Sequence, residues 1–251
     1  MTPYPELDAL LADLVEEQQR ILGENFVATY LVGSFAVGDA DEWSDVDFLT
    51  VVERPSERHA LDELHARLFE RDTGWAQHLE GSYAPREQVR RKTDDAWWFL
   101  DNGSTRLVED THCNLWAIRW ATRAHGIVLA GPEPTELIDP VDPAAIRAEA
   151  RATLEEYVRW AHEPQAKFAS GMSRWTQPYL VLTLCRVLYT LEHGTVVSKR
   201  GAADWARDRL PEWRSLIDAA LVDRPRPWER VRQPADPELV SRTLVFADSL
   251  L

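Results

Sequence analysis

The spacing of apolar residues divides the chain into a first part with helices and strands and a second part that is helical. Leucines at intervals of three and four predict an amphipathic helix over Pro5–Leu22. Phe26–Val32 is largely β-branched and aromatic, which is typical of a buried strand, and a second apolar strand ends at Val52. Ser56 is then the expected N-cap of a helix that continues to Arg71.

Four further segments complete the first part. Trp75–Tyr83 is short and mixed, and its position predicts a strand beside the first two. Pro85–Asp101 is basic and then aromatic, so it either lines a binding pocket or forms a loop packed by tryptophans over the sheet. Glu109–His125 has the composition of a helix, and Ile127–Ala130 predicts a brief last strand.

The clearest change of pattern is a proline-rich connection that begins at Gly131–Pro132. After it, helical spacing predicts helices over Pro143–His162, Gln177–His193, Ala202–Leu210, Pro211 to about Val222, and Leu239–Leu251. Gly194 is the expected stop of the second of these helices. We therefore expect an α+β protein of two domains: residues 1–135 with a mixed sheet flanked by helices, and residues 136–251 as an α-helical bundle.

Composition narrows the class of protein. The chain has 251 residues, 45% of them hydrophobic, and eleven tryptophans, which indicates a folded globular protein. Its net charge of −14 disfavours a nucleic-acid partner and suits a small cationic substrate. No apolar run is long enough to span a membrane, and the first residues do not resemble a signal peptide, so we expect a cytoplasmic protein without a membrane partner.

Cysteine chemistry contributes little to the prediction. Cys113 and Cys185 lie far apart in apolar segments, which favours two reduced, buried thiols over a disulfide. His112 stands next to Cys113, but no further Cys or His lies at the spacing of zinc ligands. A zinc site is therefore not expected.

The candidate chemistry gathers between the first two strands. Gly33 and Ser34 end the first strand, and a glycine there lets the backbone approach a ligand closely. Asp45 and Asp47 begin the next strand two residues apart, so both carboxylates project on the same side. A solvated acidic strand start is the simplest interpretation of such a pair. The preceding Gly-Ser turn favours a Mg²⁺ site instead, because Mg²⁺ takes one or two carboxylates together with substrate phosphates.

A third carboxylate, Glu80, lies on the strand expected beside the first two. An isolated glutamate is usually a surface residue, but its place in the predicted strand order allows it to converge on Asp45 and Asp47. We therefore include Glu80 among the candidate catalytic residues.

The pattern around the first two strands resembles the signature of the polymerase-β-type nucleotidyltransferases. It consists of Gly-Ser, about ten further residues, and then Asp-x-Asp within an apolar strand. A second resemblance comes from the helical part. Four segments are similar to the helical domain of aminoglycoside adenylyltransferases of the streptomycin/spectinomycin type. They are Leu180–Tyr189, Gly194, Ser198-Lys199 and Ala202–Ala206. Val128–Pro132 and Leu137–Pro140 also resemble the segment between that family's domains.

The resemblance implies a reaction and its residues. ATP donates AMP to a hydroxyl group of a small molecule, pyrophosphate is released, and the modification confers antibiotic resistance. Glu80 would take the hydroxyl proton, and Asp45 and Asp47 would bind the catalytic Mg²⁺. The nucleotide would be held by Gly33, Ser34, Ser44 and Lys199, together with Asn114 where the family has a carboxylate.

The expected drug-binding segment differs from the family pattern. Gly171–Tyr179 contains no acid and adds Arg174, although Trp175 could supply an aromatic wall for a substrate. Glu155, Glu156 or Glu163 could replace the missing acids if the helices place them suitably. Two alternatives stay open: a nucleotidyltransferase that modifies a protein, as in a toxin–antitoxin pair, and a nucleotide-binding sensor without turnover. We expect a monomer or a weak dimer.

Overall fold

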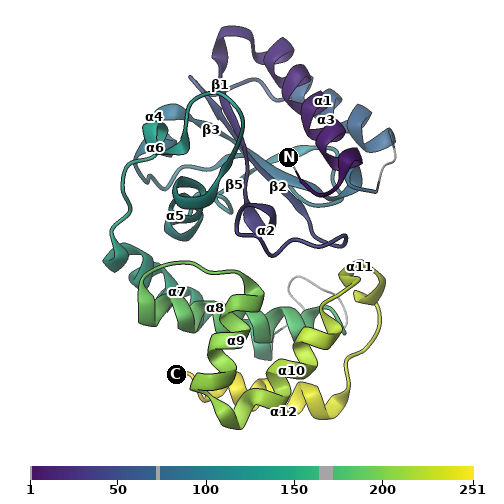
Figure 1. The fold of residues 1–251 in the computed structure, drawn as a ribbon, viewed down its shortest axis with the longest axis vertical. Helices are drawn as coiled ribbons and strands as arrows, with labels where there is room; N and C mark the ends of the chain where they lie inside the picture. Colours follow the sequence, from purple (N-terminus) through teal and green to yellow (C-terminus); the bar gives the residue numbers. More distant parts are fainter. Residues whose placement is uncertain (1, 72–73, 164–171) are drawn as a thin grey trace. The chain divides into compact units, whose positions relative to one another are not determined.

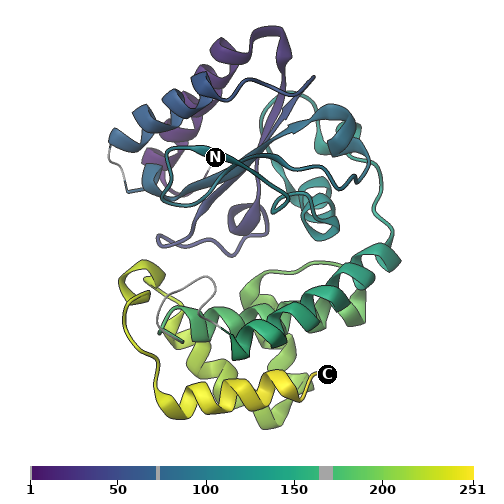
Figure 2. The same cartoon turned by 180° about the vertical axis from the view of Figure 1, so that it is seen from behind.

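The structure is a computed structural model that describes residues 2–71, 74–163 and 172–251, and it divides into two compact units. Unit 1 spans Met1–Val141 and unit 2 spans Asp142–Leu251. Figures 1 and 2 show the elements of both units from opposite sides. The boundary expected after residue 135 falls within helix α6 (Pro134–Leu137), which packs against helix α5 (Trp116–His125) of unit 1.

Unit 1 is built around a six-stranded sheet in the order β5-β4-β3-β2-β1-β6. Its strands are β1 (Phe26–Leu31), β2 (Val46–Val52), β3 (Leu79–Pro85), β4 (Trp97–Leu100), β5 (Leu107–Asp110) and β6 (Ile127–Ala130). β2 and β3 are parallel, and the other neighbouring pairs are antiparallel. The sheet is therefore mixed, as the sequence predicts.

Two helices, α1 (Pro5–Leu22) and α3 (His59–Glu70), lie side by side on one face of this sheet (Figures 1 and 2). Their leucines form an apolar core with inward-facing strand residues such as Leu31 and Phe48. The alternate strand residues, among them Tyr30 and Leu49, form a second core on the other face. The remaining helices of the unit are α2 (Gly33–Ala36), α4 (Arg86–Arg90), α5, α6 and the short 3₁₀ turns Gly23–Asn25 and Ala76–His78.

A chain of buried polar side chains crosses the core beneath α1 and α3. His65 Nε2 lies 2.8 Å from the Tyr83 hydroxyl, which also accepts a hydrogen bond of 3.0 Å from Gln18 Nε2. Gln18 Oε1 in turn accepts from Thr29, whose hydroxyl lies 3.1 Å from that of Thr50. The Tyr83 hydroxyl thus joins His65 of α3 to Gln18 of α1. Burial lowers the pKa of His65 to about 3, so this histidine is neutral.

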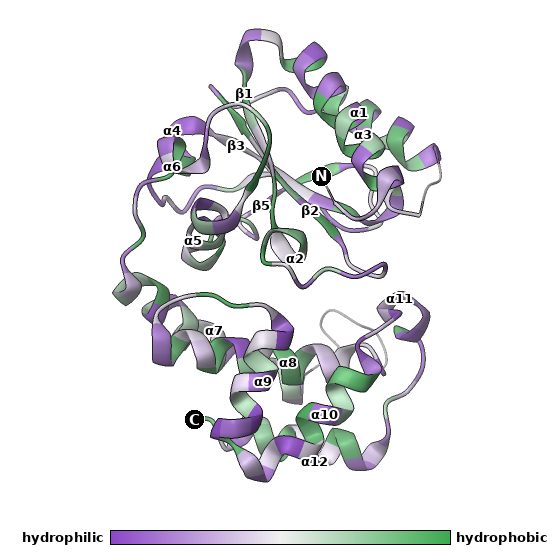
Figure 3. Ribbon diagram, viewed as in Figure 1, coloured by the Kyte–Doolittle hydropathy of each residue, from purple (hydrophilic) through white to green (hydrophobic). Residues whose placement is uncertain are grey.

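Unit 2 consists of helices packed around α8 (Thr176–His193). The others are α7 (Pro143–His162), α9 (Lys199–Arg209), α10 (Arg214–Asp223), α11 (Pro227–Arg230) and α12 (Pro237–Asp248). α8 contacts α7, α9, α10 and α12, and most of its side chains are buried. Gly194 ends α8 in the left-handed conformation, as predicted. Figure 3 shows the mixture of hydrophilic and hydrophobic residues along α7 and α1 that is typical of amphipathic helices.

No helix within the described ranges is both long enough and apolar enough to cross a membrane.

The start of α3 differs from the sequence prediction because tertiary contacts decide it. Ser56 does not cap α3, which begins at His59 without a side-chain cap. Instead, the Ser56 hydroxyl accepts a hydrogen bond from Asn25, and its carbonyl accepts one from Trp98. The chain after β2 is thereby tied to two other segments before the helix starts.

The helix predicted over Glu109–His125 is wrong in its first part. Leu107–Asp110 is the edge strand β5, and α5 begins only at Trp116. A single residue of β5, Leu107, is buried, so the strand lacks the alternating pattern that would have revealed it. Similarly, Pro85–Asp101 is not a plain loop, since it contains α4 and β4.

Candidate active site

The predicted carboxylates meet at the start of the only parallel strand pair among the described residues. Asp47 of β2 is directly opposite Glu80 of β3, and side chains that are opposite in register share a face of the sheet. Both are partly exposed, whereas Val46 and Phe48 on either side of Asp47 point into the core beneath α1 and α3. Asp45 directly precedes β2, two residues before Asp47.

The backbone of Gly33 lies directly over the carboxylate of Asp47. Gly33 has φ +60°, and a Cβ added to it would lie 1.8 Å from Asp47 Oδ2. The N–H of Val32 donates a hydrogen bond of 2.8 Å to the Asp47 carbonyl, which fixes this approach. Only glycine fits at residue 33, because the position requires both a left-handed backbone and the absence of a side chain. The Gly-Ser turn and the aspartates thus form one compact arrangement, with α2 beside β2 (Figure 1).

The two predicted phosphate-binding serines differ in their surroundings. Ser34 is partly buried within α2, in the turn that covers Asp47. Ser44 belongs to the loop before β2, where its hydroxyl accepts from the Asp41 N–H at 2.9 Å and lies 3.2 Å from Asp41 Oδ1. Ser44 therefore orders its own loop, and its contact with a phosphate stays a prediction.

Glu80 has a partner that the sequence did not indicate. His112 Nε2 lies 3.4 Å from Glu80 Oε1, and the His112 ring packs against Phe99 with 5.0 Å between ring centroids. The Glu80 side chain is 18% exposed, so the carboxylate is accessible and yet held beside the histidine.

The thiol of Cys113 lies near the same carboxylates. Burial raises the pKa of this thiol to about 12, and the charges of Glu80, Asp47 and Asp110 contribute in the same direction. The thiol is therefore protonated at neutral pH. The acceptors that Asp45, Asp47 and Glu80 offer a cation are carboxylate oxygens. Such oxygens are the ligands of a hard cation, and Asp45 and Asp47 fit Mg²⁺ in type and number.

The turn after β4 brings in two residues that sequence reasoning missed. Asn102 Nδ2 donates a hydrogen bond of 2.6 Å to Asp45 Oδ1, and Asn102 Oδ1 lies 3.1 Å from Nδ1 of His78. The preceding residue, Asp101, follows Leu100, which pairs with Gly81 in an antiparallel register. Asp101 therefore lies one residue beyond the end of this pairing, and Glu80 lies one residue before Gly81. The sequence marks this segment as a turn, but only the strand order shows that it reaches the carboxylates.

Asn114 lies in the interior of unit 1, with 1% of its surface exposed. Its Nδ2 donates to the carbonyls of Thr93 and Asp95, at 3.0 and 2.7 Å, and its Oδ1 accepts from Arg119 at 2.7 Å. These bonds hold the segment before β4, so the amide is engaged within the protein. A contact between Asn114 and a nucleotide has no support in this geometry and stays a prediction.

Lys199 and Trp175 belong to unit 2, where one aromatic cluster holds both. Lys199 is the first residue of α9 and not part of a loop, and Ser198 caps the helix. The Nζ atom of Lys199 lies 5.1 Å from the centroid of the Tyr179 ring. That ring stacks on the ring of Trp175, with 5.1 Å between centroids and 15° between planes. Trp228 continues the stack beyond Trp175 at 6.5 Å.

The guanidinium group of Arg174 forms an ion pair within unit 2. Arg174 forms two hydrogen bonds to the carboxylate of Asp223, of 2.6 and 3.2 Å, and Arg230 donates to the same carboxylate at 2.8 Å. Arg174 also donates to Gln233 at 3.0 Å. The predicted substitutes Glu155, Glu156 and Glu163 are exposed on and just after α7.

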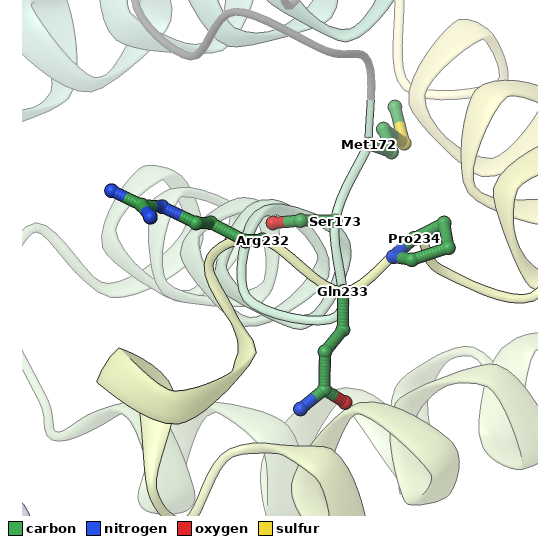
Figure 4. A pocket seen from close by; sticks show the side chains of 5 residues that line it. All are labelled: Met172, Ser173, Arg232, Gln233 and Pro234. Atoms are coloured by element: carbon green, nitrogen blue, oxygen red, sulfur yellow. The ribbon is translucent and has the colours of Figure 1, made fainter.

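A pocket of about 230 Å³ lies in unit 2, lined by Met172, Ser173, Arg232, Gln233 and Pro234. Figure 4 shows the side chains of Arg232 and Gln233 pointing in different directions, so they do not converge on a common ligand. Ser173 and Pro234 also form a β-bridge that closes this part of the chain. The residues that line this pocket therefore do not form a second candidate active site.

No group of three or more His, Cys, Asp or Glu side chains in the described ranges has the arrangement of a complete metal site. Two carboxylates are nevertheless sufficient for Mg²⁺ when substrate phosphates supply further oxygens.

Comparison with known proteins covers both units. Residues 15–100 match the family described as nucleotidyltransferase domain, and residues 136–240 match aminoglycoside adenylyltransferase, C-terminal domain. An aminoglycoside (3'') (9) adenylyltransferase of Shigella flexneri is 27% identical over 230 residues, with 82% of this chain and 80% of the relative covered. A spectinomycin 9-adenylyltransferase of Staphylococcus aureus is 28% identical over 222 residues, with 80% and 78% covered.

A solved structure has the same fold. Spectinomycin adenyltransferase AAD(9) from Enterococcus faecialis, solved with ATP and spectinomycin, matches with a TM-score of 0.68 and 16% sequence identity. The match covers 96% of this chain and 97% of that one.

Proposed function

Since the chain belongs to the aminoglycoside adenylyltransferase family and is a nucleotidyltransferase, we propose that it transfers AMP from ATP to a hydroxyl group of an aminocyclitol or aminoglycoside antibiotic, such as spectinomycin or streptomycin. Pyrophosphate is the second product. The observation that carries this proposal is the convergence of Gly33, Asp47 and Glu80 at the start of the parallel pair β2–β3.

Asp45 and Asp47 would hold Mg²⁺, which supplies positive charge to the phosphates and to the departing pyrophosphate. The protein's own contribution begins with Gly33. Because residue 33 has no side chain, the turn lies directly against Asp47 and holds this carboxylate in place. The backbone of the same turn, with Ser34, would bind the phosphates of ATP.

Glu80 acts as the general base in this proposal. It accepts the proton of the acceptor hydroxyl while the hydroxyl oxygen attacks the α-phosphorus and the bond between the α-phosphorus and the bridging oxygen breaks. His112 holds the carboxylate from one side, at 3.4 Å. Asp101 is a second candidate for the same role, because it directly follows Leu100, which pairs with the residue after Glu80.

Lys199 would bind phosphate from unit 2, and its cation–π contact with Tyr179 holds the ammonium group near the ring. The stacked rings of Trp175 and Tyr179 would form a wall for the acceptor. Because Asp223 is already bound by Arg174 and Arg230, it is not available to bind the cationic groups of a drug.

A direct test incubates the purified chain with ATP, Mg²⁺ and a panel that includes spectinomycin, streptomycin and a 2-deoxystreptamine aminoglycoside. Mass spectrometry should show one acceptor gaining a single AMP, with pyrophosphate released in equal amount. Glu80→Gln should remove turnover and leave binding of an ATP analogue intact, because it removes the base and keeps the shape.

The second candidate base is tested in parallel. Asp101→Asn should retain most of the turnover if Glu80 is the base, and the opposite pattern would assign the role to Asp101. Full activity of both variants would show that neither carboxylate takes the proton.

A further inference from the structure

A hydrogen-bonded chain joins three segments at the edge of the carboxylate site. Asp45 precedes β2, His78 ends the 3₁₀ turn before β3, and Asn102 follows β4. The register explains their meeting: Val46 pairs with Leu79, so the residues before them, Asp45 and His78, are neighbours at the start of the parallel pair.

The chemistry of the three groups determines the direction of each bond. A carboxylate only accepts, so the amide nitrogen of Asn102 donates to Asp45 Oδ1 over 2.6 Å. The amide oxygen then faces His78 Nδ1 at 3.1 Å, and since an amide oxygen only accepts, Nδ1 carries the proton. His78 thus constrains the rotation of the Asn102 amide, and the amide holds Oδ1 of the Asp45 carboxylate.

We propose that Asn102 and His78 are positioning residues that orient the Asp45 carboxylate for the catalytic metal ion. This inference rests on the proposed function, because it requires Asp45 to be a metal ligand. Asp45 lies outside β2, in a segment that the strand ladder does not constrain, whereas Asp47 lies within β2 and under Gly33. The hydrogen bonds through Asn102 and His78 constrain the orientation of the Asp45 side chain, as the strand and the Gly33 turn constrain that of Asp47.

Outer partners of metal ligands typically change metal affinity about 10–100-fold when they are removed. Asn102→Leu removes both bonds while keeping a side chain of similar volume. His78→Leu leaves the amide in place but allows it to rotate, so its effect should be smaller. His78→Asn retains an N–H donor near the position of Nδ1 and should restore most of the affinity.

The first measurement needs no metal. Nitrogen-15 spectra of the metal-free full chain, recorded at a pH where histidines are neutral, report which ring nitrogen of His78 is protonated. The wild-type protein should show the Nδ1–H form, and Asn102→Leu should shift His78 towards the Nε2–H form. A wild-type His78 in the Nε2–H form would overturn the proposal, since the amide oxygen would then face an unprotonated nitrogen.

The second measurement is calorimetric binding of an ATP analogue with a methylene bridge between the α- and β-phosphorus atoms, at graded Mg²⁺ concentrations. The Mg²⁺ concentration for half-maximal binding should rise about 10–100-fold in Asn102→Leu. Binding without Mg²⁺ and the melting temperature should stay near those of the wild-type protein. His59→Leu, a histidine exposed on α3, is the matched control and should change nothing.

The outcomes separate the inference from the proposed function. If Mg²⁺ promotes binding to the wild-type protein and Asp45→Asn abolishes this effect, but Asn102→Leu behaves as wild type, the positioning role alone is overturned. If Asn102→Leu loses binding with and without Mg²⁺ and melts much earlier, its role is structural and the proposal is again overturned. If Mg²⁺ does not affect binding to the wild-type protein, the metal part of the proposed function fails and the inference fails with it.

Discussion

The backbone of Gly33 and the carboxylate of Asp47 are so close that residue 33 has no room for a side chain. Two constraints coincide there, a positive φ and a direct approach to a candidate metal ligand. A positive φ alone is common at glycines in loops, but the approach ties the conformation of the turn to the position of a candidate metal ligand.

Gly33→Ala should therefore reduce adenylyl transfer by more than about 100-fold, because the new Cβ displaces Asp47 or the turn, and positioning on this scale controls such rates. Steady-state assays of pyrophosphate release give the measurement. Gly38→Ala is the matched control: Gly38 also has a positive φ of 72°, but an added Cβ would have no heavy atom within 4 Å. A Gly33→Ala enzyme with the activity of Gly38→Ala would show that the turn does not position Asp47.

At this scale the sequence predicted the residues that belong to a local motif. Gly33, Asp45 and Asp47 lie within fifteen positions of one another, and their spacing alone indicates a shared site. Asn102 and His112 could not be found in this way. They reach Asp45 and Glu80 only through the order β4-β3-β2, which no local pattern encodes.

At the level of single elements, the starts of two helices can be compared. Ser198 and Ser56 both precede helices and both have the residue type that favours an N-cap. Ser198 does cap α9, by accepting a hydrogen bond of 3.0 Å from the Gly201 N–H. Ser56 instead bonds to Asn25, because the chain leaving β2 runs past the turn before β1. Residue spacing predicted a helix after each serine, but a competing tertiary partner decided the cap at Ser56.

Ser198→Ala should lower the free energy of unfolding of unit 2 by about 1 kcal/mol, the usual effect of losing an N-cap side chain. Urea denaturation followed by the circular dichroism of the helices would measure it. Ser241→Ala, an exposed change within α12, should stay within about 0.5 kcal/mol of wild type. Equal effects from both changes would mean that the Ser198 cap contributes nothing to α9.

The whole molecule consists of two units with separate apolar cores, and the polar chain through His65 lies entirely within the first. The sequence predicted this division from the loss of strand periodicity after the proline-rich connection. It could not predict the buried polar chain, because Gln18, Thr29 and His65 come from three elements whose packing is not visible in local patterns.

The buried His65 predicts acid sensitivity for unit 1. Its pKa is about 3 in the folded protein and about 6.5 in an unfolded chain, so between these values the unfolded state binds the extra proton. Acid therefore favours unfolding. The contribution of neutral His65 to the free energy of unfolding is complete above pH 6.5 and is lost as the pH decreases below that value. The contribution of this one group between pH 7 and pH 5 should be about 2 kcal/mol.

Denaturation of the wild-type protein and His65→Gln at several pH values would test this. Glutamine can keep an acceptor for the Tyr83 hydroxyl but does not titrate, so the variant should lose less stability on acidification. His59→Gln should retain the wild-type slope, because His59 is exposed. A His65→Gln protein with that same slope would show that His65 is not the responsible group.

The position of β6 has a consequence for how the protein is made. β1 lies between β2 and β6, so its second edge stays unpaired until Ile127–Ala130 has left the ribosome. Asp45, Asp47, Glu80 and Asn102 all precede that strand in the chain. During synthesis the carboxylate site can therefore assemble on a sheet that still has an open edge. The arrival of one four-residue strand completes the sheet before any helix of unit 2 exists.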